Sequence, residues 1–300
     1  MNNQRRLALA LFIILIIFLV ELVGGFVSNS LALLSDAGHM LTDTMALGLA
    51  LLAALFAARP ATKERTFGFY RLEILSALFN GSLLALVALY IFYEAVVRFL
   101  HPVAVRSDIL LLVATVGLLA NVGAAVILAK SSRDSLNVRG AFLHVLSDLV
   151  SSVAVIIGGI LIRYLGWYYI DPFLGIVIGI MILRGALGLV LESVNILLEA
   201  TPRDTKLEEV AAAIRQVNGI EDLHDLHIWT ITTGMNAISA HLVIADALTD
   251  KAAAIVAEVK AVLQAKYQIN HATFQTECES CPEGLICRTE PAAREHGHRH

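Results

Sequence analysis

Charged residues are scarce in this sequence. Of its 300 residues, 16% are Asp, Glu, Lys or Arg, whereas soluble domains contain about 25%. Hydrophobic residues make up 57% of the chain, and the mean hydropathy is +0.73. This composition indicates that most of the chain lies in a lipid bilayer.

Other absences narrow the function. The net charge of -4 and the pI of about 6.2 leave no basic excess for nucleic acid. The sequence contains no G-x-x-x-x-G-K-[ST] run, so ATP is not a visible energy source. It also lacks H-E-x-x-H, and catalytic zinc normally has three protein ligands and a water. A zinc-sensing receptor would require an effector domain, and none is evident. These absences argue against a nucleic-acid-binding protein, an ATPase, a zinc hydrolase and a receptor.

Six apolar segments have the length of about 20 residues that a bilayer core requires. The predicted spans are 7–27, 31–57, 73–97, 108–129, 140–163 and 172–197. The first span follows two arginines, as in a signal peptide, but it is longer, contains Glu21 and lacks a cleavage site, so we expect a retained helix.

Lysine and arginine are distributed unevenly around these spans. They gather before the first span, between the second and third, and between the fourth and fifth. The opposite loops hold only Arg98, Arg106 and Arg163. The positive-inside rule therefore predicts that both termini are cytoplasmic.

Two spans carry the same pattern, His39-x-x-x-Asp43 and His144-x-x-x-Asp148. Residues four apart share a helix face, so two such helices facing each other offer four nitrogen and oxygen ligands, which suit tetrahedral zinc. An ionisable residue within a membrane costs roughly 2.5–3.5 kcal/mol on insertion scales and is expected to be functional. The simpler alternative is that each membrane histidine makes a hydrogen bond between helices.

The predicted spans place the two pairs at different depths. His39 and Asp43 lie about a third of the way in from the non-cytoplasmic end, whereas His144 and Asp148 lie near the cytoplasmic start of the fifth span. Because boundaries read from sequence err by several residues, a tilted or longer fifth helix would bring the pairs level.

The composition changes after residue 200. A break at residues 201–204 precedes a predicted helix, two strands, a second helix and a third strand. Their predicted bounds are 206–217, 226–231, 238–244, 249–267 and 272–276. The order αββαβ predicts a small two-layer domain, which a partner subunit or a metal would help to stabilise. We expect a transport domain at 1–200, this domain at 201–277, and a tail at 278–300.

The soluble part has its own potential metal ligands. His224, His241 and Glu277 form the favoured constellation, whereas His227 should point to the opposite face of its strand from His224. The cytoplasmic Cys-x-x-Cys favours a thiolate metal site over a disulfide, although an idle or redox-sensitive tail remains an alternative. We predict that seven residues gather at one end of the sheet and bind zinc: His224, His241, His271, Glu277, Cys278, Cys281 and Cys287.

Four segments carry a resemblance to a known family. They are residues 30–43 (SLALLSDAGHMLTD), 65–75 (RTFGFYRLEIL), 136–139 (LNVR) leading to His144, and 224–229 (HDLHIW). In combination and in this order they resemble the cation diffusion facilitator family. More narrowly, they are similar to its bacterial zinc, cobalt and cadmium exporter branch, which is close to the animal zinc transporters.

The resemblance implies a homodimeric exporter with six transmembrane helices in the bacterial inner membrane. It also implies a cytoplasmic ferredoxin-like domain of the metallochaperone type, and exchange of zinc, with cadmium or cobalt as further candidates, for protons. It assigns His39, Asp43, His144 and Asp148 to one transport site on helices that meet at one depth. In this family, histidine at the first position is associated with a preference for zinc over cadmium. A further zinc site of some relatives is expected to be missing, because the loop 62–69 contains no histidine.

Overall fold

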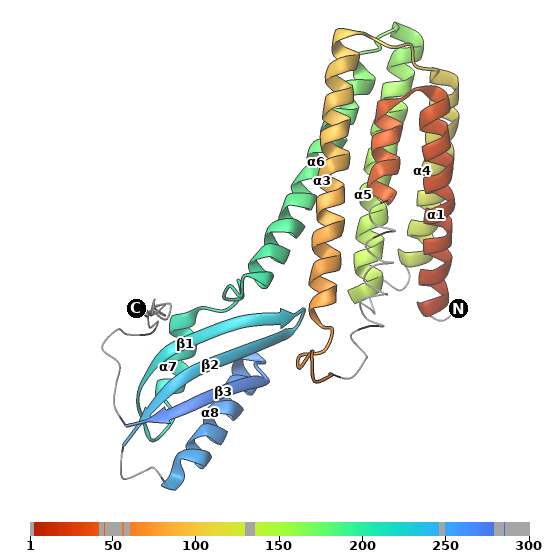
Figure 1. Cartoon of the computed structure of the whole chain (residues 1–300). Helices are drawn as coiled ribbons and strands as arrows, with labels where there is room; N and C mark the ends of the chain where they lie inside the picture. Colours follow the sequence, from red (N-terminus) through yellow and green to blue (C-terminus); the bar gives the residue numbers. More distant parts are fainter. Residues whose placement is uncertain are drawn as a thin grey trace, which may run out of the picture. The chain divides into compact units, whose positions relative to one another are not determined.

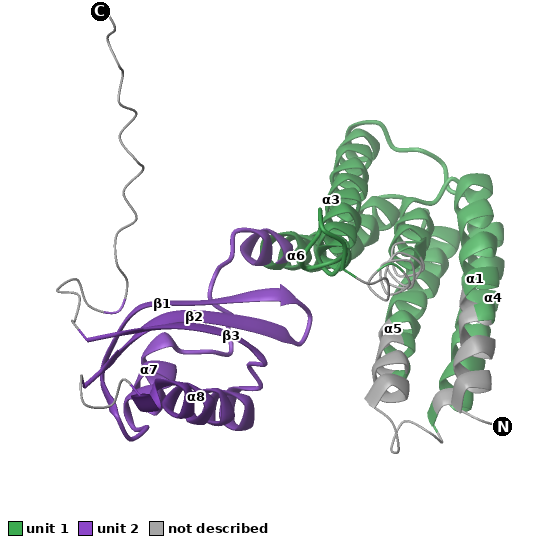
Figure 2. Ribbon diagram, turned by 60° about the horizontal axis from the view of Figure 1, so that its bottom comes forward, with its two compact units in different colours: residues 1–192 green, residues 193–300 purple. Residues whose placement is uncertain are grey.

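The structure, a computed structural model, describes residues 3–41, 45, 56, 61–129, 136–245, 250–278 and 285. The chain divides into two compact units, residues 1–192 and 193–300 (Figure 2). Each unit has its own core.

The first unit is helical (Figure 1). Its labelled helices are α1 (Asn3–Ser28), α3 (Arg71–Leu100), α4 (Ser107–Ala129), α5 (Leu136–Leu165) and α6 (Ile170–Leu197), the last of which runs on into the second unit. Residues 31–41 are also helical.

Within the described residues, four helical segments are long and apolar enough to cross a membrane. They are Arg71–Leu100, Ser107–Ile127, Asp148–Leu165 and Ile170–Leu197. The last four predicted spans are therefore confirmed as apolar helices. The first is helical with a shorter apolar stretch, Leu15–Ser28, and most of the second lies outside the described residues.

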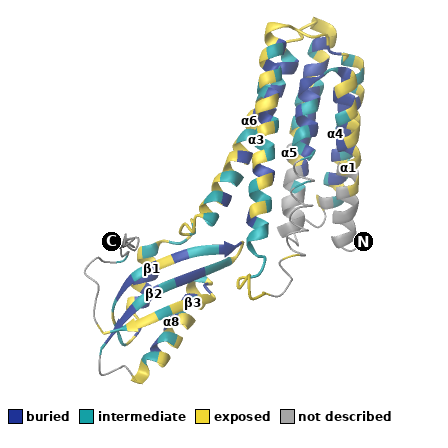
Figure 3. Cartoon of the chain, viewed as in Figure 1, coloured by how far each residue is buried: buried dark blue, intermediate teal, exposed yellow. Residues whose placement is uncertain are grey.

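The outer surface of this unit is apolar. Leu86, Val126, Val150 and Met181 are between 61% and 69% exposed, and Figure 3 shows exposed positions along the length of the helices. Apolar surface of this extent marks a face that contacts lipid or a partner. Inside, a cluster of buried aliphatic side chains joins the helices, and Leu31, Ala88, Leu110, Val155 and Ile182 belong to it.

The second unit has the predicted order αββαβ. Its elements are α7 (Leu207–Arg215), β1 (Ile220–Thr232), β2 (Met235–Ile244), α8 (Ala252–Tyr267) and β3 (His271–Glu277). The sheet order is β1-β2-β3, with β1 antiparallel and β3 parallel to β2. A parallel neighbour requires a crossover, which α8 provides. Side chains from both helices and all three strands form one core, including Ile214, Leu223, Leu242, Leu263 and Phe274.

Strand β1 begins six residues before its predicted start at residue 226. The register shifts between His224 and His227, and Asp225 has a positive φ of 49°. This bulge interrupts the alternation of side chains, so the first half of the strand does not follow the period of two. The hairpin turns at Gly234, whose φ of 75° is a left-handed conformation that glycine adopts without strain.

Candidate functional site

The helix of residues 31–41 and α5 meet where the predicted membrane ligands lie. His39 Nε2 is 3.9 Å from Asp148 Oδ1. The His39 side chain is 35% exposed and that of Asp148 is 5% exposed. His144 belongs to α5, one helical turn before Asp148, and Asp43 lies outside the described residues.

Helix α5 is longer than its predicted span, and the 3.9 Å approach places His39 and Asp148 at the same level of the two helices. The helix begins at Leu136 rather than at residue 140, so Asp148 lies more than three turns inside it. Polar residues of the first turn, among them Asn137 and Arg139, interrupt the apolar run although the helix continues through them. The sequence reading therefore began the helix too late.

Two more buried carboxylates lie close to this pair. Asp36, one turn before His39, accepts a hydrogen bond from Ser151 Oγ of α5 at 2.5 Å. Glu21 of α1 is 1% exposed, and its Oε2 has no hydrogen-bond partner among the described residues. The neighbouring α1 residues Ile17 and Phe18 pack against Ala37 and Met40, which flank His39 in the sequence. Sequence reasoning did not assign either residue to the site, although an ionisable residue within a predicted span is itself a signal of function.

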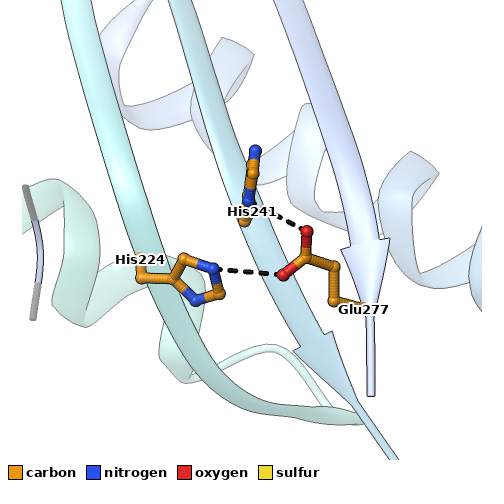
Figure 4. A group of neighbouring side chains, drawn as sticks. All are labelled: His224, His241 and Glu277. Atoms are coloured by element: carbon orange, nitrogen blue, oxygen red, sulfur yellow. Dashed lines mark ion pairs between the residues drawn. The ribbon is translucent and has the colours of Figure 1, made fainter. Parts of the chain in front are cut away.

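The second unit brings together His224, His241 and Glu277, one from each strand (Figure 4). His224 and His241 are directly opposite each other in the antiparallel pair. Glu277 binds both rings: its Oε2 is 3.1 Å from His224 Nε2, and its Oε1 is 3.0 Å from His241 Nδ1. One ligand atom from each residue lies within 4.8 Å of the others.

The donor set of this cluster fits a zinc ion. Two imidazoles and one carboxylate are ordinary zinc ligands. The His224 residue is 4% exposed, and its Nδ1 has no hydrogen-bond partner in the described part of the chain. A buried polar atom without a partner is costly, and a bound ion or an ordered water would satisfy it. The three residues can therefore hold a metal or share protons.

The β1 bulge adds a second layer around the cluster. Asp225 Oδ2 is 3.7 Å from His241 Nε2, and Asp225 Oδ1 is 3.0 Å from His227 Nε2. Outer carboxylates of this kind orient ligating imidazoles. A backbone hydrogen bond from Leu223, with smaller effects of the Arg215 guanidinium, lowers the pKa of Asp222. Another ionised carboxylate therefore lies on the same strand.

Of the remaining predicted ligands, His271 and Cys278 are described, and neither belongs to this group of three. His271 begins β3 and Glu277 ends it, about 20 Å apart at the rise of an extended strand. The prediction that His271 lies at the same end of the sheet is therefore wrong, because the extended strand separates the two residues that flank it. Cys278 is exposed and follows Glu277 directly, whereas Cys281 and Cys287 lie outside the described residues.

Comparison with known proteins adds independent information. Residues 7–198 match the cation efflux transmembrane domain, and residues 202–279 match the cation efflux protein, cytoplasmic domain. The chain is 39% identical over 303 residues to the "Cadmium, cobalt and zinc/H(+)-K(+) antiporter" of Bacillus subtilis, covering 99% of this chain and 97% of the relative. It is 43% identical over 282 residues to the "Metal cation efflux system protein CzcD" of Cupriavidus metallidurans, covering 94% and 89%. It is 40% identical over 307 residues to the "Zinc transporter ZitB" of Escherichia coli, covering 100% and 95%.

The chain belongs to the cation efflux family. It is a membrane transporter of metal cations and not an enzyme. The resemblance to the cation diffusion facilitator family and its bacterial exporter branch is confirmed.

Proposed function

We propose that this protein exports zinc from the cytoplasm in exchange for protons, through a site formed by His39, Asp43, His144 and Asp148. The observation that carries the proposal is the 3.9 Å separation of His39 and Asp148 across two helices. Each of these residues belongs to an i, i+4 pair of histidine and aspartate, so the approach of one residue from each pair supports a shared four-ligand site.

Proton exchange follows from the chemistry of these ligands. Zinc binds neutral imidazole and ionised carboxylate, so binding expels protons and protonation weakens the site. An unperturbed histidine titrates near pH 6.5, about the range in which cytoplasm and exterior differ. The same residues can then carry zinc outward and protons inward, provided that the site opens to the two sides in turn.

The relatives support the choice of cargo and of coupling ion. Zinc appears in the names of the Bacillus subtilis and Escherichia coli proteins, and the former name also includes cadmium, cobalt and H(+). We therefore propose zinc as the principal cargo and cadmium and cobalt as further candidates. The distribution of lysine and arginine supports cytoplasmic termini in a bacterial inner membrane.

We further propose six transmembrane helices within residues 1–200 and a ferredoxin-like cytoplasmic domain at 201–277 that forms a homodimer. The name of the matching domain, ZT_dimer, supports dimerisation. In this domain His224, His241 and Glu277 would hold a structural zinc ion. The ion would join the three strands and would take no part in catalysis. Of the 278–300 tail, Leu285 accepts a backbone hydrogen bond from Leu226 at 2.8 Å, which supports a contribution of the tail cysteines near β1.

Zinc uptake by inverted membrane vesicles tests the proposed function. With the vesicle interior made acidic, zinc should accumulate inside, because protons leaving the lumen drive zinc entry. Vesicles from cells without the protein, and vesicles treated with a protonophore, serve as controls. Zinc accumulation that is indifferent to the pH gradient would contradict proton exchange.

Replacing His39 with aspartate should shift the selectivity of transport toward cadmium. A carboxylate is shorter than an imidazole and can bind through two oxygens, so the site accepts a larger ion with more ligands. We expect the ratio of cadmium to zinc transport rates to rise about tenfold, equivalent to about 1.4 kcal/mol. Initial rates with each metal in the same proteoliposomes measure the ratio, and an unchanged ratio would refute the role of His39 in selectivity.

A further inference from the structure

The first turn of α6 is bonded to the beginning of the helix that follows α1. Asp171 is 1% exposed, and it accepts hydrogen bonds from the N–H of Leu31 to Oδ2 at 2.7 Å and of Ala32 to Oδ1 at 3.2 Å. Asp171 Oδ1 also accepts from Ser30 Oγ at 2.5 Å, and Ser30 Oγ accepts from the N–H of Leu33 at 3.2 Å. The N–H groups that a helix leaves unbonded at its first turn are thus largely satisfied by two side chains.

Arg98 of α3 joins the same group. Its Nη1 donates to Asp171 Oδ2 at 3.4 Å and to the Asn29 carbonyl at 2.6 Å, and its Nη2 donates to Asn29 Oδ1 at 3.3 Å. Its Nε donates to Glu94 at 2.9 Å. Arg98 is 6% exposed. A buried ion pair is sustained when further hydrogen bonds complete it, and here Asp171 accepts three besides the one from Arg98. We call Asp171, Arg98, Asn29 and Ser30 the Asp171 node.

Contact between the two helices continues one turn further along α6. A Cβ atom on Gly175 would lie 3.0 Å from Leu31 Cγ and 3.5 Å from Ser35 Oγ, so the missing side chain allows this close approach. His39 follows Leu31 by two turns, a distance of about 12 Å along the helix. A helix of this length is stiff, and an axial shift at Leu31 therefore moves His39 by a similar amount.

We propose that Asp171 is a positioning residue for metal transport. It fixes the helix of residues 31–41 along its own axis, in the position that brings His39 opposite Asp148. Arg98 makes this position depend on α3 as well. The proposal rests on the proposed function, in which His39 binds the cargo. Residues hydrogen-bonded to metal ligands change metal affinity by about 10- to 100-fold when replaced, and Asp171 acts over a longer distance, so we expect an effect at the lower end of this range. Loss of the node should therefore weaken zinc binding more than it slows the maximal rate.

The test measures initial rates of zinc uptake into proteoliposomes over a range of zinc concentrations. Asn matches Asp in shape, but its NH2 group cannot accept a hydrogen bond from the Leu31 N–H. For Asp171→Asn we expect KM for zinc to rise by about tenfold while the maximal rate changes little. An unchanged KM in a folded Asp171→Asn protein would overturn the proposal.

Asp108→Asn is the matched control. Asp108 of α4 pairs with Arg163 of α5, so it is also a carboxylate bound to an arginine of another helix, but its side chain is 80% exposed. Its KM should equal that of the parent, and an equal rise in both variants would overturn a specific role for Asp171. If Asp171→Asn does not accumulate, Ser30→Ala carries the test, because it removes one hydrogen bond to Asp171 and should raise KM by a smaller factor. No rise in KM for Ser30→Ala would then overturn the proposal.

His39→Ala separates the two hypotheses. If His39→Ala retains the parent KM and rate, the four-ligand site fails, and the positioning role fails with it. If His39→Ala loses transport while Asp171→Asn keeps the parent KM, only the positioning role is overturned. Loss of transport in His39→Ala together with a raised KM in Asp171→Asn supports both.

Discussion

Replacing Asp148 with asparagine is expected to reduce zinc transport by about 100-fold or more, because even outer partners of metal ligands are worth about 10- to 100-fold. Asp148 is buried and lies 3.9 Å from His39, where it would supply negative charge to a divalent cation in a site of low dielectric. Asparagine keeps the shape of the side chain and removes the charge. The measurement is zinc uptake by inverted vesicles with an imposed pH gradient.

The same loss is expected for Asp43→Asn, whose position one turn after His39 completes the first pair. Asp108→Asn, at the exposed carboxylate of α4, controls for the general effect of removing a charge and should transport normally. Each variant must elute at the same position as the parent protein for the comparison to hold. Near-normal transport by both Asp148→Asn and Asp43→Asn would refute the four-ligand site.

Zinc should raise the melting temperature of a fragment that begins at residue 201. The second unit has its own core, so the fragment is expected to fold. A ligand at 100 times its dissociation constant stabilises the folded state by about 2.7 kcal/mol. For a domain of this size that energy corresponds to a rise of about 10–20 °C, measured by thermal unfolding with zinc and with a chelator.

Two variants make this prediction specific. Glu277→Gln removes the carboxylate that contacts both imidazoles and should abolish most of the zinc effect. His271→Ala changes a histidine at the other end of β3 and should retain the full effect. The double variant Cys278→Ser with Cys281→Ser tests the thiolates, and an unchanged zinc stoichiometry and melting temperature would exclude them. A zinc effect that survives Glu277→Gln would place the ion elsewhere.

Local patterns in the sequence predicted most of the helices and the αββαβ order, because apolar runs and alternation depend on neighbouring residues. The i, i+4 spacing also identified His39 and Asp148, which the structure brings together. The pairing of residues on strands that are distant in the sequence could not be predicted from local patterns. The sequence near His271 does not show which residue of β2 it faces, and in the structure that residue is Ala237.

Buried polar partners were the other features that sequence reasoning missed. Asp36 was visible within a predicted span, but its bond to Ser151 depends on how two helices face each other. The link between Ser30 and Asp171 joins residues 141 positions apart. Neither side chain is unusual in its local context, since serine and aspartate are both common at helix ends.

The link between Ser30 and Asp171 also has a consequence for biosynthesis. The ribosome synthesises Leu31 and Ala32 about 140 residues before Asp171, whose carboxylate accepts their hydrogen bonds. An N–H group without a partner is costly in hydrocarbon, so the start of this helix must stay hydrated until the last membrane helix arrives. Insertion of α6 therefore completes an element made at the beginning of the chain, and under the proposed role of Asp171 a nascent protein truncated before α6 would lack a fixed position for His39.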